Sequence, residues 1–181
     1  MSRITTITND MANAEQSALL EAIQQKLGMV PNFLRVFANS PTALKGFLGL
    51  HSITEQGELD GQTKERIALV LAQQNGCEYC LSAHTAIGRK AGLSTTEIEA
   101  NREGTSEDAR AAVAVKLAKS LAENQGDVTT AELQEARNVG YSEAEIVEII
   151  THVGMNVLTN ILAKTAQVDI DFPKVSLDVA A

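Results

Sequence analysis

The chain has 181 residues, of which 44% are apolar and 21% charged, a composition typical of a folded globular protein and inconsistent with a disordered chain. Its length predicts one domain over residues 1–181 with a core of its own. The formal net charge of −8, the isoelectric point near 4.9 and the lack of a basic cluster argue against nucleic-acid partners.

No segment reads as a targeting or membrane signal. Residues 1–16 lack the basic and apolar regions of a secretory leader. The longest apolar run, residues 146–163, is interrupted by Glu148, His152, Asn156 and Asn160. We therefore expect a cytoplasmic protein without a membrane partner, in which a close pair of cysteines is more often catalytic or metal-binding than a permanent crosslink.

The N-terminal segment, residues 13–56, is predicted to hold three helices. A capping box formed by Asn13 and Gln16 opens the first helix, and a serine–proline pair opens the third. The expected ranges are 14–27, a short helix over 33–38, and 41 to about 56.

The central region, residues 62–98, carries the strongest helical pattern. One helix begins at Asp60, runs through KERIALVLAQQ and ends at an Asn-Gly pair, and the next covers residues 77–91. A further capping box, Ser94 with Glu97, begins another helix.

The C-terminal region, residues 106–181, is predicted to contain helices over 106–124 and 130–139 and one more that begins at the capping box of Ser142 and Glu145. The tail, 168–181, alternates apolar and acidic residues and is expected to pack as an extended arm, of a kind that often crosses onto a neighbouring subunit. Because no run of alternating β-branched residues occurs, we predict an all-α protein, an orthogonal bundle of about eight or nine helices.

The segment CEYCLSAH holds both cysteines of the chain and one of its three histidines. On a helix that starts near residue 77, Cys77, Cys80 and His84 fall on one face. The helix N-terminus stabilises a thiolate at Cys77, whereas His84 lies one turn from Cys80 and can form a thiol–imidazole hydrogen bond. The pattern therefore favours reactive thiols but leaves open which cysteine reacts first.

A carboxylate on the preceding helix completes this set. Glu65 shares a helical face with small and apolar residues, so its carboxylate is expected to point inward and to need a partner. His84, on the next helix, is the candidate partner, and Glu65–His84–Cys80 then forms a proton relay.

Three other interpretations of the same residues stay open. Cys77, Cys80 and His84 could be three ligands of a zinc ion in a non-catalytic module, with His152 or a carboxylate as the fourth. The C-x-x-C pair could mark a thioredoxin-like domain or a general dithiol–disulfide oxidoreductase, although the strands of a thioredoxin fold are missing. Both cysteines could also be inert core residues.

The spacing of Glu65, eleven residues, Cys77-x-x-Cys80, three residues and His84 resembles that of the AhpD-like alkylhydroperoxidases of the carboxymuconolactone decarboxylase superfamily. The flanking segments GMVPNFLRVFANSPTALKGFL and HVGMNVLTNILAKTAQVDIDF are similar to the leading and closing segments of the peroxidase-related branch. The resemblance covers most of the chain.

The resemblance implies an all-α subunit that assembles as a trimer or hexamer and reduces organic hydroperoxides or hydrogen peroxide without a metal or other cofactor. It implies that Cys80 is the peroxidatic thiol, Cys77 the resolving thiol, and His84 with Glu65 the relay, with an external dithiol as reductant. One departure is Tyr79, where members of the family carry a second histidine; its phenol does not titrate near neutral pH, so its part in a relay is open.

Other polar residues fall on apolar helices. His51 is expected at the edge of the core. His152, Asn156 and Asn160 recur every four residues, a stripe that either lines a wet cavity or forms hydrogen bonds across a subunit contact. The apolar remainder of residues 146–161 is too extensive for one buried face, which favours a homo-oligomer.

Overall fold

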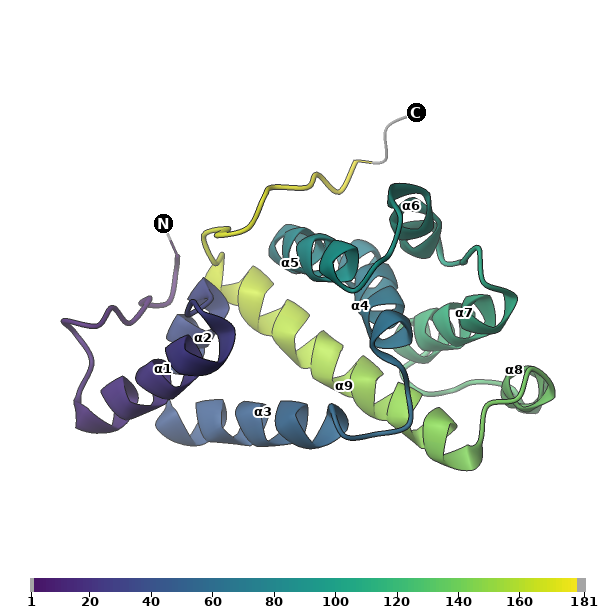
Figure 1. Cartoon of the computed structure of the whole chain (residues 1–181), viewed down its shortest axis with the longest axis horizontal. Helices are drawn as coiled ribbons and strands as arrows, with labels where there is room; N and C mark the ends of the chain where they lie inside the picture. The colour runs from purple at the N-terminus through teal and green to yellow at the C-terminus, as the bar shows by residue number, and fades with distance from the viewer. Residues whose placement is uncertain (1, 179–181) are drawn as a thin grey trace.

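The computed structural model describes residues 2–178, and within that range the chain forms α-helices and no strands. The predicted all-α fold class is confirmed. The helices, labelled in Figure 1, are α1 (Ala14–Leu27), α2 (Asn32–Phe37), α3 (Pro41–Thr54), α4 (Gly61–Gln74), α5 (Glu78–Lys90), α6 (Thr95–Glu103), α7 (Ala109–Glu123), α8 (Thr130–Asn138) and α9 (Glu143–Ala166).

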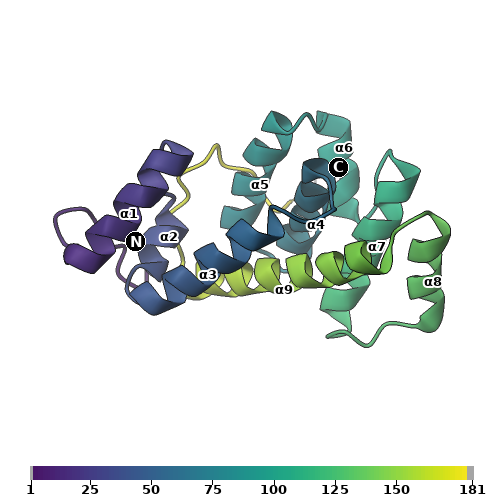
Figure 2. The same ribbon diagram turned by 60° about the horizontal axis from the view of Figure 1, so that its bottom comes forward.

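The long helix α9 crosses the middle of the molecule and organises the others around it. It packs against α3 on one side and against α4 and α5 on the other, with α1 and α2 near one end and α7 and α8 near the other (Figures 1 and 2). By length and composition alone α9 could span a membrane, but in this structure it packs among the other helices and 44% of its most apolar stretch is buried.

The core consists of three apolar clusters. The first joins α4, α7 and α9 around Ile67, Leu117 and Ile149. The second surrounds the two cysteines and includes Leu69 and Leu81. The third joins α1, α2 and α3. The first two clusters both use α4, whose residues 66–72 are all buried, as the apolar run of the sequence predicts.

Most predicted helix ends agree with the structure to within two residues, and the exceptions have clear causes. α7 begins at Ala109 rather than at Ser106, because Asp108 is the N-cap and accepts a hydrogen bond from the Ala111 amide. The predicted capping box at Ser94 is only half formed. Ser94 accepts from the Glu97 amide, but the Glu97 carboxylate turns inward to other partners.

The C-terminal arm, which we define as residues 167–178, has no helix and packs back onto its own chain. Figure 1 shows it in yellow, leaving the end of α9 and passing beside α5 toward α6. Ile170, Phe172, Val175 and Leu177 add apolar contacts to the cluster that contains the cysteines.

Candidate active site

A tight turn between α4 and α5 places the two cysteines. Asn75 is the C-cap of α4, and Gly76 follows it with φ of 62°, a left-handed conformation that glycine adopts without strain. Cys77 is then the N-cap of α5 rather than part of its first turn, and its Sγ accepts a hydrogen bond from the Cys80 amide at 3.2 Å. The cap position places Cys77 Sγ beside the free backbone amides of the first helical turn, which stabilise negative charge.

The two sulfurs are joined in a disulfide, with the Cα atoms 5.3 Å apart. The residues are almost fully buried, at 1% exposure for Cys77 and 4% for Cys80. Leu69, Ala72 and Leu81 belong to the apolar cluster around them. The structure therefore describes the oxidised form of a dithiol that is shielded from water.

Glu65 and His84 form the polar part of the site. Glu65 Oε2 lies 2.9 Å from His84 Nδ1, in a pair that joins α4 to α5. The two side chains are partly open to solvent, at 17% and 23% exposure. Because the carboxylate engages Nδ1, it orients the imidazole and leaves Nε2 as the nitrogen that can exchange a proton.

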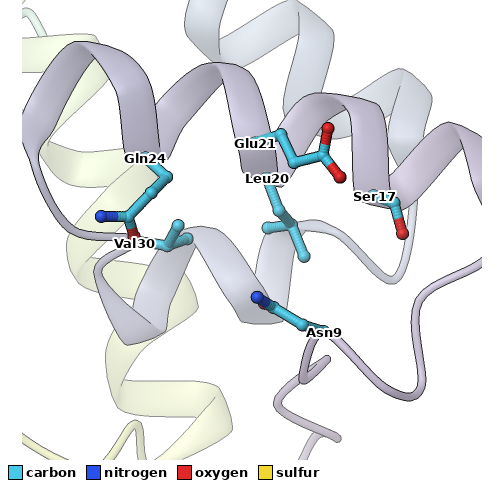
Figure 3. Close-up of a pocket in the computed structure, with 6 residues that line it drawn as sticks. All are labelled: Asn9, Ser17, Leu20, Glu21, Gln24 and Val30. Atoms are coloured by element: carbon cyan, nitrogen blue, oxygen red, sulfur yellow. The ribbon is translucent and has the colours of Figure 1, made fainter.

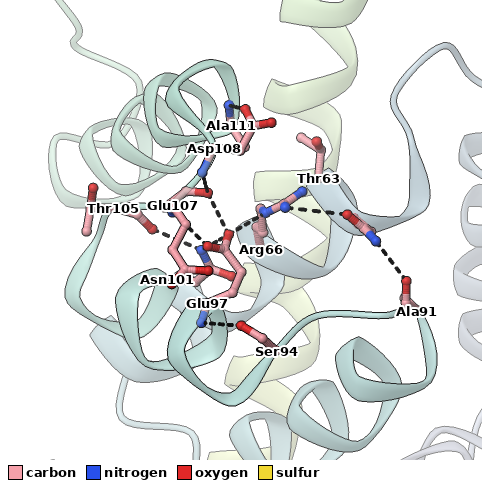
Figure 4. A network of polar contacts seen from close by, with 12 residues as sticks. Thr63, Arg66, Ala91, Ser94, Glu97, Asn101, Thr105, Glu107, Asp108 and Ala111 are labelled. Carbon is pink, nitrogen blue, oxygen red and sulfur yellow. Dashed lines mark hydrogen bonds and ion pairs between the residues drawn. The ribbon is translucent and has the colours of Figure 1, made fainter.

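The neighbour of Glu65 on α4 has a different, structural partner. Arg66 donates through Nε to the buried carboxylate of Glu97 on α6 at 2.6 Å, as Figure 4 shows. Glu97 also accepts from Ser106, Asn101 and the Glu107 amide. Burial alone would raise the pKa of Glu97, but these hydrogen bonds outweigh it and lower the pKa to about 2. The network fixes α6 and the start of α7 against α4.

Tyr79 is not arranged as a second base. Its hydroxyl donates to Asp171 Oδ1 at 2.8 Å and accepts from the Phe33 amide at 3.3 Å. Burial and then the hydrogen bond to Asp171 raise the pKa of Tyr79 well above its ordinary range. The phenol therefore stays neutral and is committed to two partners outside the dithiol.

The polar stripe on α9 lies inside the chain. His152, Asn156 and Asn160 are all buried, so the expectation that they could meet a neighbouring subunit is wrong. Asn160 accepts from Asn75 at 2.8 Å and Asn156 donates to the His152 carbonyl at 2.9 Å. Burial lowers the pKa of His152, whose Nε2 has no protein partner. The structure thus brings none of the three side chains into hydrogen-bond contact with the dithiol or with the Glu65–His84 pair.

His51 behaves as the sequence predicts for a residue at the edge of the core. Its ring packs on Phe47 with centroids 6.0 Å apart. Burial lowers the pKa of His51, and the Glu55 carboxylate opposes that effect.

A metal-binding reading of the motif has little geometric support. Among residues 2–178, no group of three or more histidine, cysteine, aspartate or glutamate side chains is arranged to hold a metal ion. In this oxidised form both sulfurs that the zinc interpretation requires are bonded to each other.

Two cavities lie away from these residues. One, of about 110 Å³, lies between the N-terminal segment and α1 (Figure 3). The other, of about 190 Å³, lies at the starts of α4 and α7 beside Arg110 and Tyr141. Neither is lined by a cysteine or a histidine, so they are separate from the dithiol. The first is lined by Asn9, Ser17, Leu20, Glu21, Gln24 and Val30.

Sequence reasoning missed the contribution of the C-terminal arm to this region. Asp171 and Lys174 contact the two residues between the cysteines, Tyr79 and Glu78. The only local signal is that three charged residues are interspersed among the apolar residues of the segment VDIDFPK, and nothing in that pattern identifies their partners.

Comparisons with known proteins agree with this fold. Residues 41–120 match the carboxymuconolactone decarboxylase family. A peroxidase-related protein from Silicibacter sp. TM1040 is 26% identical, with 92% of each chain covered and a TM-score of 0.80. A peroxidase-related protein from Ralstonia eutropha JMP134, with an alkylhydroperoxidase AhpD core, is 20% identical over 94% of this chain and 92% of that one, with a TM-score of 0.84.

A curated relative matches a shorter segment. The protein YdfG of Bacillus subtilis (strain 168) is 32% identical over 53 residues, which is 29% of this chain. The match spans about a third, 36%, of that protein's length.

Proposed function

We propose that the chain, whose residues 41–120 match the carboxymuconolactone decarboxylase family and whose fold is AhpD-like, is a cysteine-dependent peroxidase. The observation that carries the proposal is the 2.9 Å contact between Glu65 on α4 and His84 on α5. Helix α5 also contains Cys80 and has Cys77 as its N-cap. A carboxylate–imidazole pair one turn from a thiol is the arrangement that activates a thiol nucleophile.

The proposed reaction begins with the reduced form. The Cys80 thiolate attacks one peroxide oxygen, the O–O bond breaks, and the leaving oxygen takes a proton and departs as an alcohol or water. Cys80 is then a sulfenic acid. The Cys77 thiol condenses with it, releasing water and forming the disulfide. An external dithiol reduces that disulfide and is itself oxidised.

Each residue has a distinct role in this proposal. His84, oriented by Glu65, takes the thiol proton of Cys80 and returns a proton to the departing oxygen. Cys77 at the helix N-cap is the resolving thiol, and the cap amides lower the cost of forming its thiolate. Tyr79 takes no proton in the cycle, because its hydroxyl is bound to Asp171 and the Phe33 amide.

We also propose that the protein acts in the cytoplasm as a homo-oligomer. Large apolar side chains are exposed along one stripe of α9, and α3 carries a second stripe with Leu50 and Ile53. Gly154 on the α9 stripe opens onto free space. Surfaces of this kind mark contacts between protein chains. The exposed side chains on α9 are Val147, Ile150, Leu158 and Ile161.

The stoichiometry of a single turnover tests the proposed reaction. Fully reduced protein is mixed with one equivalent of an organic hydroperoxide, and thiols, alcohol and disulfide are counted. We expect one alcohol formed for each pair of thiols lost and a Cys77–Cys80 disulfide in peptide maps. Thiols unchanged by the peroxide would overturn the proposal. In that case a metal titration of the reduced protein distinguishes a zinc-binding module from an inert thiol pair.

A further inference from the structure

The two residues between the cysteines, Glu78 and Tyr79, both bind the C-terminal arm. The Tyr79 hydroxyl donates to Asp171 Oδ1 at 2.8 Å, and Lys174 Nζ lies 3.2 Å from Glu78 Oε2. The disulfide closes a short loop that contains Glu78 and Tyr79. The arm therefore docks on the same segment that the disulfide constrains.

The Tyr79–Asp171 contact belongs to a larger junction. The other oxygen of Asp171 accepts from the Asn32 amide at 2.8 Å, and the Phe33 amide donates to the Tyr79 hydroxyl at 3.3 Å. The rings of Phe33 and Phe172 meet the Tyr79 ring edge-on, with centroids 5.9 and 5.8 Å away. Tyr79 thus joins the start of α2 and the arm to the segment between the cysteines.

Further along, the arm is held by α5 and by the helices beside it. The Val175 amide donates to Ser82 Oγ at 3.0 Å. Gln73 Nε2 donates to the Leu177 carbonyl at 2.9 Å, and Arg102 donates to the Ser176 carbonyl at 2.9 Å. These contacts keep the arm near α5, so a change at Glu78 or Tyr79 alters how closely the arm docks rather than releasing it entirely.

We propose that Asp171 and Lys174 are positioning residues for the dithiol, and that docking of the arm and closure of the Cys77–Cys80 disulfide favour each other. The inference rests on the proposed dithiol chemistry. When an external dithiol reduces the disulfide, each sulfur gains a hydrogen, the reductant becomes a disulfide, and the covalent closure of the Glu78–Tyr79 segment is lost. The side chains that bind the arm are then less constrained, and docking weakens.

Thermodynamic linkage makes the coupling reciprocal. The factor by which the disulfide strengthens docking of the arm equals the factor by which the docked arm favours the disulfide. Weakening the arm contacts must therefore make the disulfide easier to reduce, even in the absence of any peroxide.

A redox titration of the full chain in buffers of reduced and oxidised dithiothreitol tests this. The chain has two tyrosines, which provide a test variant and a matched control. The hydroxyl of Tyr79 binds the arm, whereas the hydroxyl of Tyr141 has no hydrogen-bond partner of normal geometry. We expect Tyr79→Phe to lower the equilibrium constant for disulfide formation by about fivefold. We expect Tyr141→Phe to stay within about twofold of wild type. Equal constants for Tyr79→Phe and wild type would overturn the inference.

A second pair of variants tests the ion pair between Lys174 on the arm and Glu78. Lys174→Met removes the ion pair with Glu78, while Lys45→Met removes a short exposed ion pair with Glu15 at a distant place. Only Lys174→Met should shift the constant, and in the same direction as Tyr79→Phe. A shift of equal size in both lysine variants would also overturn the inference, because it would show a general charge effect.

Hydrogen exchange of three backbone amides reports on the arm directly. The Asn32, Phe33 and Val175 amides are bound across the junction, and each should exchange faster in reduced than in oxidised wild-type protein. Equal exchange in both redox states contradicts the coupling. If no oxidising buffer closes the disulfide, the proposed function fails as well; if it closes but no variant shifts its constant, only the coupling fails.

Discussion

Glu65 Oε2 and His84 Nδ1 lie 2.9 Å apart, although the two residues are nineteen positions apart in the chain. The contact joins α4 to α5 and fixes which nitrogen of the imidazole is engaged. Cys77 is the N-cap of α5, and Cys80 lies within that helix. Helices α4 and α5 together therefore position both the Glu65–His84 pair and the dithiol. The carboxylate thus determines how the imidazole is oriented relative to the thiols.

Replacing Glu65 by Gln should slow the reaction of reduced protein with an organic hydroperoxide by about tenfold to a hundredfold, because the amide cannot stabilise an imidazolium as a carboxylate does. The measurement is stopped-flow loss of thiol under single-turnover conditions. Glu15→Gln, an exposed glutamate paired with Lys45, is the control and should keep the wild-type rate. Wild-type kinetics in Glu65→Gln would remove Glu65 from the relay.

Replacing Glu97 by Gln should destabilise the fold without affecting the dithiol chemistry. The carboxylate accepts from Arg66, Asn101 and Ser106, and its loss leaves a buried guanidinium without its charge partner. We expect a cost of about 3 kcal/mol in the free energy of unfolding, measured by urea denaturation at neutral pH. An unchanged unfolding midpoint would show that the network is not a source of stability.

The lowered pKa of Glu97 also makes the free energy of unfolding depend on pH. Its pKa is lowered from an ordinary value near 4.5 to about 2 in the folded chain. Folding therefore gains stability from this group above about pH 4.5 and loses that gain progressively as the pH falls toward 2. Between these values Glu97→Gln should show a shallower fall in unfolding free energy than wild type. Parallel curves for the two proteins would contradict this assignment.

If the apolar stripe on α9 forms the contact between subunits, introducing charged side chains there should prevent the protein from assembling. Ile150 and Ile161 are 46% and 58% exposed, and the double change to Glu should lower the molar mass measured by light scattering to that of one chain. Ile87→Glu, on α5 with 42% exposure, is the matched control and should retain the wild-type mass. A wild-type protein that is already a monomer would contradict the proposed oligomer.

The helices and the motif could be predicted from the sequence because their signals are local. The Asn13–Gln16 capping box, the Asn-Gly stop after α4 and the spacing of Cys77, Cys80 and His84 each lie within a few residues. Glu65 could be paired with His84 because a carboxylate on an otherwise apolar helix needs a partner on the adjoining one.

Contacts between distant segments could not be predicted in the same way. Ser94 and Glu97 match a capping box, yet Glu97 binds Arg66, 31 residues earlier, because a buried guanidinium binds the carboxylate more strongly than an exposed backbone amide does. Tyr79 and Asp171 are 92 residues apart, and only the packing of the arm brings them together. The buried position of Asn156 and Asn160 depends likewise on how α9 crosses the core.

Trapping the first oxidised intermediate tests most directly whether Cys80 is the thiol that attacks the peroxide. Reduced Cys77→Ser protein is mixed with one equivalent of an organic hydroperoxide in the presence of a sulfenic-acid-specific reagent, and the adduct is located by mass spectrometry. We expect an adduct on Cys80, because the resolving thiol is missing, and no peroxide consumption by Cys80→Ser. Peroxide consumption at the wild-type rate by Cys80→Ser, with the adduct on Cys77, would contradict this expectation.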